Sequence, residues 1–238
     1  MSGILINMNK HLFRATGVAW SLLSFVVFGI AQTAVPIEKE PMHRPKFEND
    51  FVRLFDVLVP TGKATEFHVH LYDGVSVRLS TAQIVDESMS GETKLFDMKY
   101  GLATFAARPS PQTHRVVNSG KTDFRNIFIE ILSGRNSETA KPFPILSDGH
   151  VILIDNDRVR VNRLVLKPGE SSKMHTHQMR GLGIVLYDSK IEIGVPGQAK
   201  RTLEPKAGDF TWQDPGTTHT IKNIGTTAFE AIDIELKP

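Results

Sequence analysis

The sequence predicts an all-β fold composed of two similar antiparallel barrels or sandwiches. Three observations predict it: the second half of the chain repeats the first, apolar residues alternate or form short β-branched runs, and turn-forming residues separate these runs. Examples of the turns are Pro60-Thr61-Gly62, Lys167-Pro168-Gly169 and Pro215-Gly216. Short strands at this spacing, without a long stretch of helical period, are typical of antiparallel sheets. We expect helix only in the N-terminal segment 1–34.

An internal repeat organises the chain. His68 aligns with His175 at a shift of 107 residues, and the flanking residues follow the same shift without a gap. Further on the shift becomes 105 residues, where His114 aligns with His219. Each unit is about 85 residues long, and the stretch between the units is polar and then rich in proline, which is typical of a linker. We therefore expect an N-terminal barrel over residues 35–132, a linker over 133–147 and a C-terminal barrel over 148–238.

The N-terminal segment differs from the rest of the chain. The basic residues Lys10 and Arg14 precede an uncharged apolar run at 18–30, and the small residue Ala34 lies just beyond it. This arrangement predicts a secretory signal peptide over 1–34. An uncleaved anchor is the alternative, but the run is shorter than the ~20 residues that span a bilayer. We therefore expect a periplasmic or secreted protein with no stable membrane insertion after the signal is removed.

The composition excludes several classes of function. Hydrophobic residues make up 40% of the 238 residues and charged residues 23%, which is ordinary for a globular chain. The formal net charge is +2, and no Lys/Arg cluster is interleaved with aromatic residues, so nucleic-acid binding is not expected. The chain has no cysteine, which excludes disulfides, zinc–thiolate sites and thiol nucleophiles. The expected partner is a small molecule.

Six of the nine histidines occupy matched places in the two units. In each unit a His-x-His pair directs two imidazoles to one face of a strand, because residues i and i+2 of a strand point the same way. A third histidine follows on a later strand. A single such pair on an exposed strand usually has no function, but its recurrence in both units favours metal binding. The predicted ligands are His68, His70 and His114 in the first unit and His175, His177 and His219 in the second.

This pattern resembles that of the cupin superfamily. The first cupin motif begins Gly-x5-His-x-His and is matched by Gly62–His70 and by Gly169–His177. The second motif is matched closely by Gly208–Asn223, with Asp214 in the place of a proline, and more loosely in the first unit. The resemblance covers nearly all of the chain after the signal segment. It implies two tandem cupin (double-stranded β-helix, or jelly-roll) barrels, and cupins often form homo-oligomers through strand edges.

One departure from the cupin pattern concerns the metal. The glutamate ligand of the first motif is absent, and Gly74 and Gly181, or the residues after them, stand in its place. Three alternatives stay open. The histidines alone hold the metal, as in some iron-dependent cupin oxygenases; a residue such as Asp73 or Gln178 replaces the glutamate; or the sites are vestigial and bind a small molecule without metal.

Three neutral imidazoles would leave the charge of a divalent iron, zinc, manganese, nickel or copper ion uncompensated, with coordination positions open. Such a centre attracts an anionic chelator. The resemblance implies dioxygenase-type chemistry for a redox-active metal, whereas zinc would favour hydrolysis or lyase chemistry. The alternative is binding of a small molecule or metal without turnover. Because the second unit keeps the second motif better, it is expected to be the active one if only one unit is active.

Three residues outside the histidines are candidates for contacts with the substrate. Arg108 and Arg180 lie near the motif histidines in the sequence, and either could pair with a carboxylate. Trp212 could line a barrel. Surface solvation of the arginines and core packing of the tryptophan are the alternatives. His43 and His150 are assigned no role.

Overall fold

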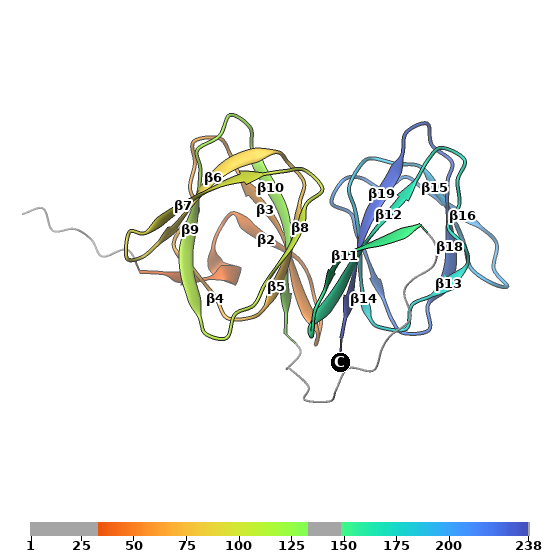
Figure 1. The fold of residues 1–238 in the computed structure, drawn as a ribbon, viewed down its shortest axis with the longest axis horizontal. Coiled ribbons are helices and arrows are strands. Elements are labelled where there is room, and N and C mark those ends of the chain that lie inside the picture. Colours follow the sequence, from red (N-terminus) through yellow and green to blue (C-terminus); the bar gives the residue numbers. More distant parts are fainter. Residues whose placement is uncertain (1–32, 133–148, 238) are drawn as a thin grey trace, which may run out of the picture. The chain divides into compact units, whose positions relative to one another are not determined.

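The computed structural model describes residues 33–132 and 149–237, so the predicted linker and nearly all of the predicted signal segment lie outside the described residues. Within these ranges the fold is all-β, as predicted, and the one helical segment is a 3-10 turn, η1 (Ile37–Lys39). No helix in the described part of the chain has the length and apolar character that a membrane crossing requires. Figure 1 shows one barrel for each repeat unit.

The N-terminal barrel consists of two five-stranded sheets. Their strand orders are β1-β4-β9-β6-β7 and β2-β3-β10-β5-β8. The pairs are antiparallel except that of β1 with β4, which is parallel. The strands of the first sheet are β1 (Val35–Pro36), β4 (His68–His70), β9 (Gln112–Asn118), β6 (Ala82–Ser88) and β7 (Thr93–Met98). Those of the second are β2 (His43–Glu48), β3 (Val52–Val59), β10 (Phe124–Ile131), β5 (Gly74–Arg78) and β8 (Ala103–Ala106).

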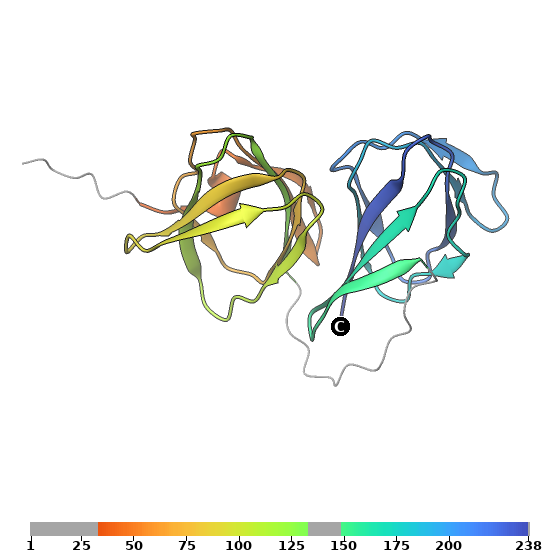
Figure 2. The same cartoon turned by 45° about the horizontal axis from the view of Figure 1, so that its top comes forward.

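The C-terminal barrel repeats this architecture, and Figure 2 shows it in green to blue. Its sheets have the orders β11-β12-β19-β14-β17 and β13-β18-β15-β16. Each strand corresponds to an N-terminal strand at the same place in its sheet, so the repeat in the sequence is a repeat of structure. The first sheet contains β11 (His150–Asp155), β12 (Val159–Leu166), β19 (Phe229–Leu236), β14 (Gly181–Val185) and β17 (Phe210–Gln213). The second contains β13 (His175–Thr176), β18 (Thr218–Asn223), β15 (Ile191–Gly194) and β16 (Arg201–Leu203).

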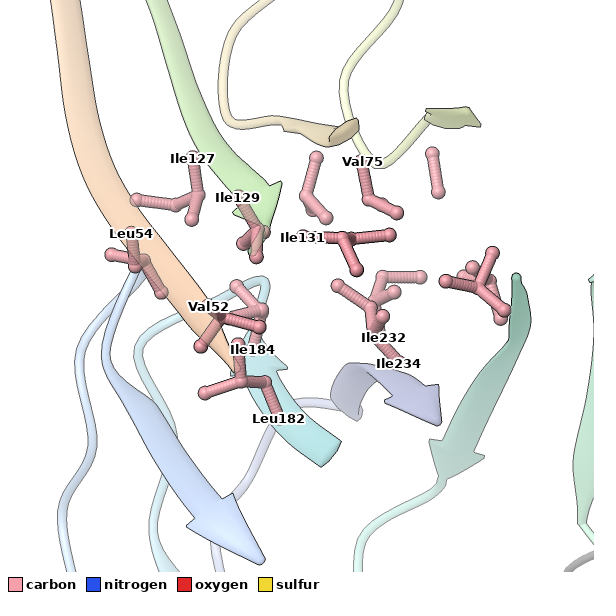
Figure 3. Packing of buried hydrophobic residues seen from close by; sticks show 14 of the residues in the cluster. Val52, Leu54, Val75, Ile127, Ile129, Ile131, Leu182, Ile184, Ile232 and Ile234 are labelled. Carbon is pink, nitrogen blue, oxygen red and sulfur yellow. The ribbon is translucent and has the colours of Figure 1, made fainter. Parts of the chain in front are cut away.

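The long strands are apolar on both faces, and each face packs against a different core. On β10, Ile127 and Ile129 belong to one buried cluster, whereas Phe124 and Phe128 belong to another. This alternation follows from the period of two along a strand. The cluster that contains Ile127 also includes residues of the C-terminal barrel, such as Ile234. Residues drawn and labelled in Figure 3 are Val52, Leu54, Val75, Ile127, Ile129, Ile131, Leu182, Ile184, Ile232 and Ile234.

Candidate metal centres

The three predicted histidines of the N-terminal barrel converge on one point. His68 and His70 are the two ends of β4, and His114 on β9 is the direct cross-strand partner of His68. The two histidines of β4 are 0% and 3% exposed, so their rings face the barrel interior. The Nε2 atom of His70 lies 3.1 Å from that of His68 and 3.0 Å from that of His114.

The C-terminal barrel repeats this convergence. His175 begins β13 and pairs directly with His219 on β18, and His177 follows one residue after the strand ends. The Nε2 atom of His219 lies 3.0 Å from that of His175 and 3.3 Å from that of His177. The side-chain nitrogens of these three residues form a group compact enough to hold a metal ion.

The spacing of the nitrogens matches that of ligands around one divalent ion. Ligand nitrogens roughly 2.0–2.1 Å from a common metal lie about 2.9 Å apart at a right angle and about 3.4 Å apart at a tetrahedral angle. The observed separations of 3.0, 3.1 and 3.3 Å fall between these limits. In each trio, two of the three nitrogen pairs therefore have the spacing of ligands on one ion.

Hydrogen bonds on the far side of the rings direct lone pairs inward. The Nδ1–H group of His68 donates to the carbonyl oxygen of Glu66 at 2.9 Å, and that of His114 donates to the carboxylate of Asp86 at 2.7 Å. A neutral imidazole that donates through Nδ1 presents a bare Nε2 lone pair. Two such lone pairs face His70, which can donate through Nε2 to only one of them. A cation at this point would satisfy all three nitrogens.

Burial keeps these imidazoles neutral. Loss of hydration lowers the pKa of His68 to about 2 and lowers the pKa of His70 as well. In the C-terminal barrel, burial lowers the pKa of both His177 and His219 to about 4, and it lowers the pKa of His175. Only the neutral ring can donate its lone pair to a metal, so the histidines are ready to bind at neutral pH.

Comparison with known proteins supports the architecture. No protein-family model and no curated protein sequence matches the chain. Among solved structures, AerE from Microcystis aeruginosa superposes with a TM-score of 0.55 at 14% identity, over 83% of this chain and 98% of that one. A mutant of oxalate decarboxylase from Bacillus subtilis superposes with a TM-score of 0.55 at 13% identity, over 81% of this chain and 74% of that one. YhaK from Escherichia coli superposes with a TM-score of 0.52 at 16% identity, over 81% of this chain and 90% of that one.

These matches extend over both barrels, because each covers about four fifths of the chain. The chain has the bicupin fold. At these identities the likeness shows the fold alone. A further structure of the Bacillus subtilis decarboxylase, which matches at 12% identity with a TM-score of 0.55, is described as having Mn(II) centres. In this bicupin, the two histidine trios stand where the sequence motifs predicted them.

A fourth histidine accompanies each trio and was not predicted from the sequence. His43 on β2 lies with its ring centroid 4.5 Å from that of His68, and its side-chain nitrogen is close enough to those of His68 and His70 for a shared ion. His150 on β11 lies 5.3 Å from His175 by the same measure. The signal was present, because His43 and His150 are also 107 residues apart. The assignment of no role is therefore corrected for His43, whereas His150 packs against His175 and lies 3.2 Å from Asp233.

The missing glutamate has a structural explanation. A Cβ atom on Gly74 would lie 2.6 Å from the ring of Phe128, and one on Gly181 would lie 2.2 Å from the carbonyl oxygen of Ile234. Gly181 therefore has no room for a side chain, and a side chain at Gly74 would require the ring of Phe128 to move. The suggested substitutes also lie elsewhere: Asp73 accepts from the backbone of Arg108 at 2.6 Å and pairs with an arginine of the other repeat, and Gln178 is exposed. Of the alternatives, coordination by histidines has the support of the geometry.

The surroundings of the two centres differ. The N-terminal trio opens onto a cavity of about 400 Å³, which Arg108 also lines. The C-terminal barrel has a buried apolar cluster of its own. Its buried residues and the side chains packed against them are Leu164, Leu166, Ile191, Phe229, Ala231, Val185, Ile193 and Ile221.

Each centre has its own charge beside the histidines. In the C-terminal barrel the buried carboxylate of Asp233 on β19 lies 3.2 Å from Nε2 of His150. Phe128 takes the equivalent place on β10 and packs edge-on against His70 at 4.9 Å. The guanidinium of Arg108 lies 5.5 Å from the ring centroid of Phe128. Carboxylates therefore lie beside both centres, since Glu40 pairs with His43 at 2.6 Å and Asp86 pairs with His114, and the N-terminal centre also has the cation Arg108 nearby.

The other two predicted substrate residues make different contacts. The guanidinium of Arg180 lies 3.7 Å from the ring centroid of Phe51, and the indole of Trp212 stacks on the same ring at 6.0 Å. Trp212 also packs against the core cluster of Figure 3. Neither residue lines the N-terminal cavity. Core packing, the alternative given for Trp212, matches its position, and the substrate role predicted for these two residues gains no support.

Proposed function

We propose that the N-terminal centre is the active site of an exported, metal-dependent oxidoreductase of the dioxygenase type, which acts on an anionic small molecule. The observation that carries the proposal is the convergence of three imidazoles at a cavity large enough for a ligand. Ligand sites in proteins are commonly clefts of roughly 300–1,000 Å³. The N-terminal unit, and not the unit with the better second motif, therefore becomes the candidate for turnover.

The residues of this centre have separable roles in the proposal. His68, His70 and His114 hold the ion, with His43 beside them as a further nitrogen. A bound redox-active ion would supply the electron exchange with dioxygen that the side chains cannot provide. Arg108 attracts the anionic group of the substrate to this end of the cavity and holds it by charge-assisted hydrogen bonds. The buried walls keep bulk water away from the ligand.

For the C-terminal centre a buried carboxylate favours a second function, metal holding without turnover. Asp233 on β19 lies beside His150 and partly compensates the charge of an ion there. A metal at this centre stabilises the barrel, because binding to the folded state adds to the free energy of unfolding.

A metal assay combined with two variants tests both roles. The protein is analysed for metal content as purified, alongside His68→Ala and His175→Ala. We expect two ions per chain in the native protein and one in each variant. Oxygen uptake by the iron-loaded protein is then followed with diketones, thiols and aromatic diols. Uptake should be lost in His68→Ala and retained in His175→Ala. No uptake with any compound, with both sites loaded, would favour a binding protein without turnover.

Export is a separate part of the proposal and rests on the N-terminal segment alone. Mass spectrometry of the protein recovered from outside the cytoplasm should show a terminus near Gln32 or Val35, after removal of the signal. A terminus at Met1 or Met8 would contradict cleavage.

A further inference from the structure

A second arginine lines the N-terminal cavity and has no carboxylate partner. Arg78 is the last residue of β5 and is partly buried. Burial lowers its pKa to about 10, so the guanidinium stays charged at neutral pH. Within the described ranges, no Asp or Glu oxygen forms an ion pair with it. The carboxylates of the cavity are engaged elsewhere, Asp86 with His114 and Asp97 with Gln83. A charge buried without a counterion is costly.

Neutral groups hold the guanidinium in place. It donates to the amide oxygen of Asn126 at 2.7 Å, to the hydroxyl of Thr104 at 3.3 Å and to the sulfur of Met98 at 3.2 Å. A guanidinium has five N–H donors, so two of them are available to a ligand. The arginine is thus oriented by its neighbours but not neutralised by them.

Arg78 lies at the end of the cavity away from the histidines. Its partner Asn126 stands two residues before Phe128 on β10, and Phe128 is the residue that packs against His70. Two residues along a strand span about 7 Å. The guanidinium also lies 5.8 Å from the ring of Phe124, which is two residues further in the same direction. A ligand that reaches both the histidines and Arg78 must therefore be elongated.

The C-terminal barrel lacks this pair of residues. Arg78 and Asn126 are cross-strand partners on β5 and β10, and the equivalent partners on β14 and β19 are Val185 and Ala231. Ala231 belongs to the buried cluster of that barrel, and Val185 packs against it. The fold therefore does not require an arginine at this place, and in the N-terminal barrel the arginine lines a cavity.

We propose that Arg78 binds a carboxylate of the ligand, at the end of the molecule remote from the metal. This inference deepens the proposed function, because it names the ligand class of the same cavity. The ligand has a chelating oxygen group for the metal, an apolar body and a terminal carboxylate. The apolar part of the wall that would contact its body is formed by Ile84, Phe96, Met98, Leu102, Val116 and Phe124.

A pair of catechols that differ only at the remote end tests this proposal. The zinc-loaded full chain is titrated calorimetrically with 3,4-dihydroxybenzoate and with 3,4-dihydroxybenzamide, since zinc does not oxidise either compound. Further acid and amide pairs, in which one or two methylene groups separate the ring from the terminal group, test longer distances between the catechol and that group. We expect the acid that fits best to bind about 10- to 100-fold more tightly than its amide, as a hydrogen bond to a charged group implies. In Arg78→Gln this ratio should fall to near one.

Two further variants serve as controls. Arg201→Gln removes a charge from an exposed arginine of the C-terminal barrel and should leave the ratio unchanged. Arg78→Lys keeps the charge without the planar fork and should give an intermediate ratio. Zinc content and melting temperature verify that each variant is folded. Because the ratio compares two ligands on each protein, any change in the metal affinity of the catechol group cancels.

The outcomes separate this inference from the proposed function. An acid-to-amide ratio near one in the native protein, or a ratio that survives in Arg78→Gln, would overturn the assignment of Arg78 while leaving the metal centre intact. Since the guanidinium acts without the metal, the ratio should also persist in the metal-free protein. If the native protein takes up no zinc but keeps the acid-to-amide ratio, the result would count against the metal centre and not against the role of Arg78.

Discussion

At the scale of single residues, the two centres depend on hydrogen bonds that the histidines make through Nδ1. His68 and His175 both donate to the backbone carbonyl two residues earlier, of Glu66 and Lys173. His114 instead donates to the side chain of Asp86. A carboxylate behind a ligand imidazole orients the ring and raises its basicity. Asp86 therefore acts on the metal through His114.

Replacement of Asp86 tests this coupling. In Asp86→Asn the affinity of the N-terminal centre for zinc should fall roughly 10- to 100-fold, which is the usual effect of losing such a partner. Competition with a chromophoric chelator measures the affinity of each centre. The C-terminal centre should be unaffected, and so should both centres in Asp157→Asn, which removes an exposed carboxylate. Unchanged affinity in Asp86→Asn would show that Asp86 does not support His114.

Glu130 predicts a dependence of stability on pH. Burial raises the pKa of this carboxyl to about 7, against the opposing effect of Arg53 at 3.4 Å. The folded protein therefore binds a proton that the unfolded chain has already lost at pH 5–6. By linkage, the stabilisation that this proton gives to the folded state is fully present below about pH 4.5 and is lost as the pH rises through about 7. The loss corresponds to roughly 3 kcal/mol in the free energy of unfolding.

The measurement is urea unfolding at a series of pH values. Glu130→Gln should remove this slope between about pH 4.5 and 7, because the amide does not titrate. Glu92→Gln, at an exposed position, should keep it. Parallel curves for the native protein and Glu130→Gln would mean that Glu130 has an ordinary pKa.

At the scale of elements, the close approach of neighbouring strands decides what the cupin motif can contain. Gly181 on β14 lies against the backbone of β19, with the carbonyl oxygen of Ile234 where a Cβ atom would be. Gly183 lies two residues along the same strand, and a Cβ atom there would meet only side chains, those of Asp233 at 3.2 Å and Gln213 at 3.4 Å. Side chains can rotate, whereas a paired strand cannot move without losing its ladder.

Two alanine substitutions on β14 distinguish these environments. Gly181→Ala should lower the free energy of unfolding by roughly 3 kcal/mol, at the upper end of the cost of overpacking. Gly183→Ala should cost clearly less, because the atoms it meets belong to side chains. Chemical denaturation measures both. Equal, small effects would show that the motif position does have room for a side chain.

At the scale of the whole molecule, one apolar cluster contains residues of both repeats. Val52, Ile129, Leu182 and Ile234 are all at most 1% exposed and belong to this cluster. The contacts of the chain after Gln32 also group as a single compact unit. We therefore expect the two barrels to unfold together.

Hydrogen exchange of two leucine variants tests this cooperativity. Leu182→Ala, in the shared cluster, should destabilise the protein by roughly 2–5 kcal/mol and increase exchange in β3 and β10 as well as in β14. Leu164 belongs to the separate cluster of the C-terminal barrel. Leu164→Ala should increase exchange in the C-terminal barrel and increase it less in the N-terminal barrel. Identical exchange patterns for both variants, confined to the C-terminal barrel, would contradict a shared core.

Sequence patterns were sufficient to predict the architecture and six histidines of the two centres, because both predictions depend on the spacing of residues along the chain. A period of two places His68 and His70 on one face, and the repeat places their counterparts at the same positions. The same repeat contained His43 and His150, which were given no role because they precede the cupin motifs. Arg108 was found by its nearness to a motif and does line the cavity.

Only the tertiary structure decided which residues line the N-terminal cavity. Arg78 lies beside Asn126 through strand pairing, and no local pattern distinguishes it from a surface arginine. The lining of a barrel interior depends on side chains that several strands bring together, as Arg78, Thr104 and Asn126 are brought together by three strands. Packing of this kind joins residues that are distant in the chain, so spacing along one strand does not reveal it.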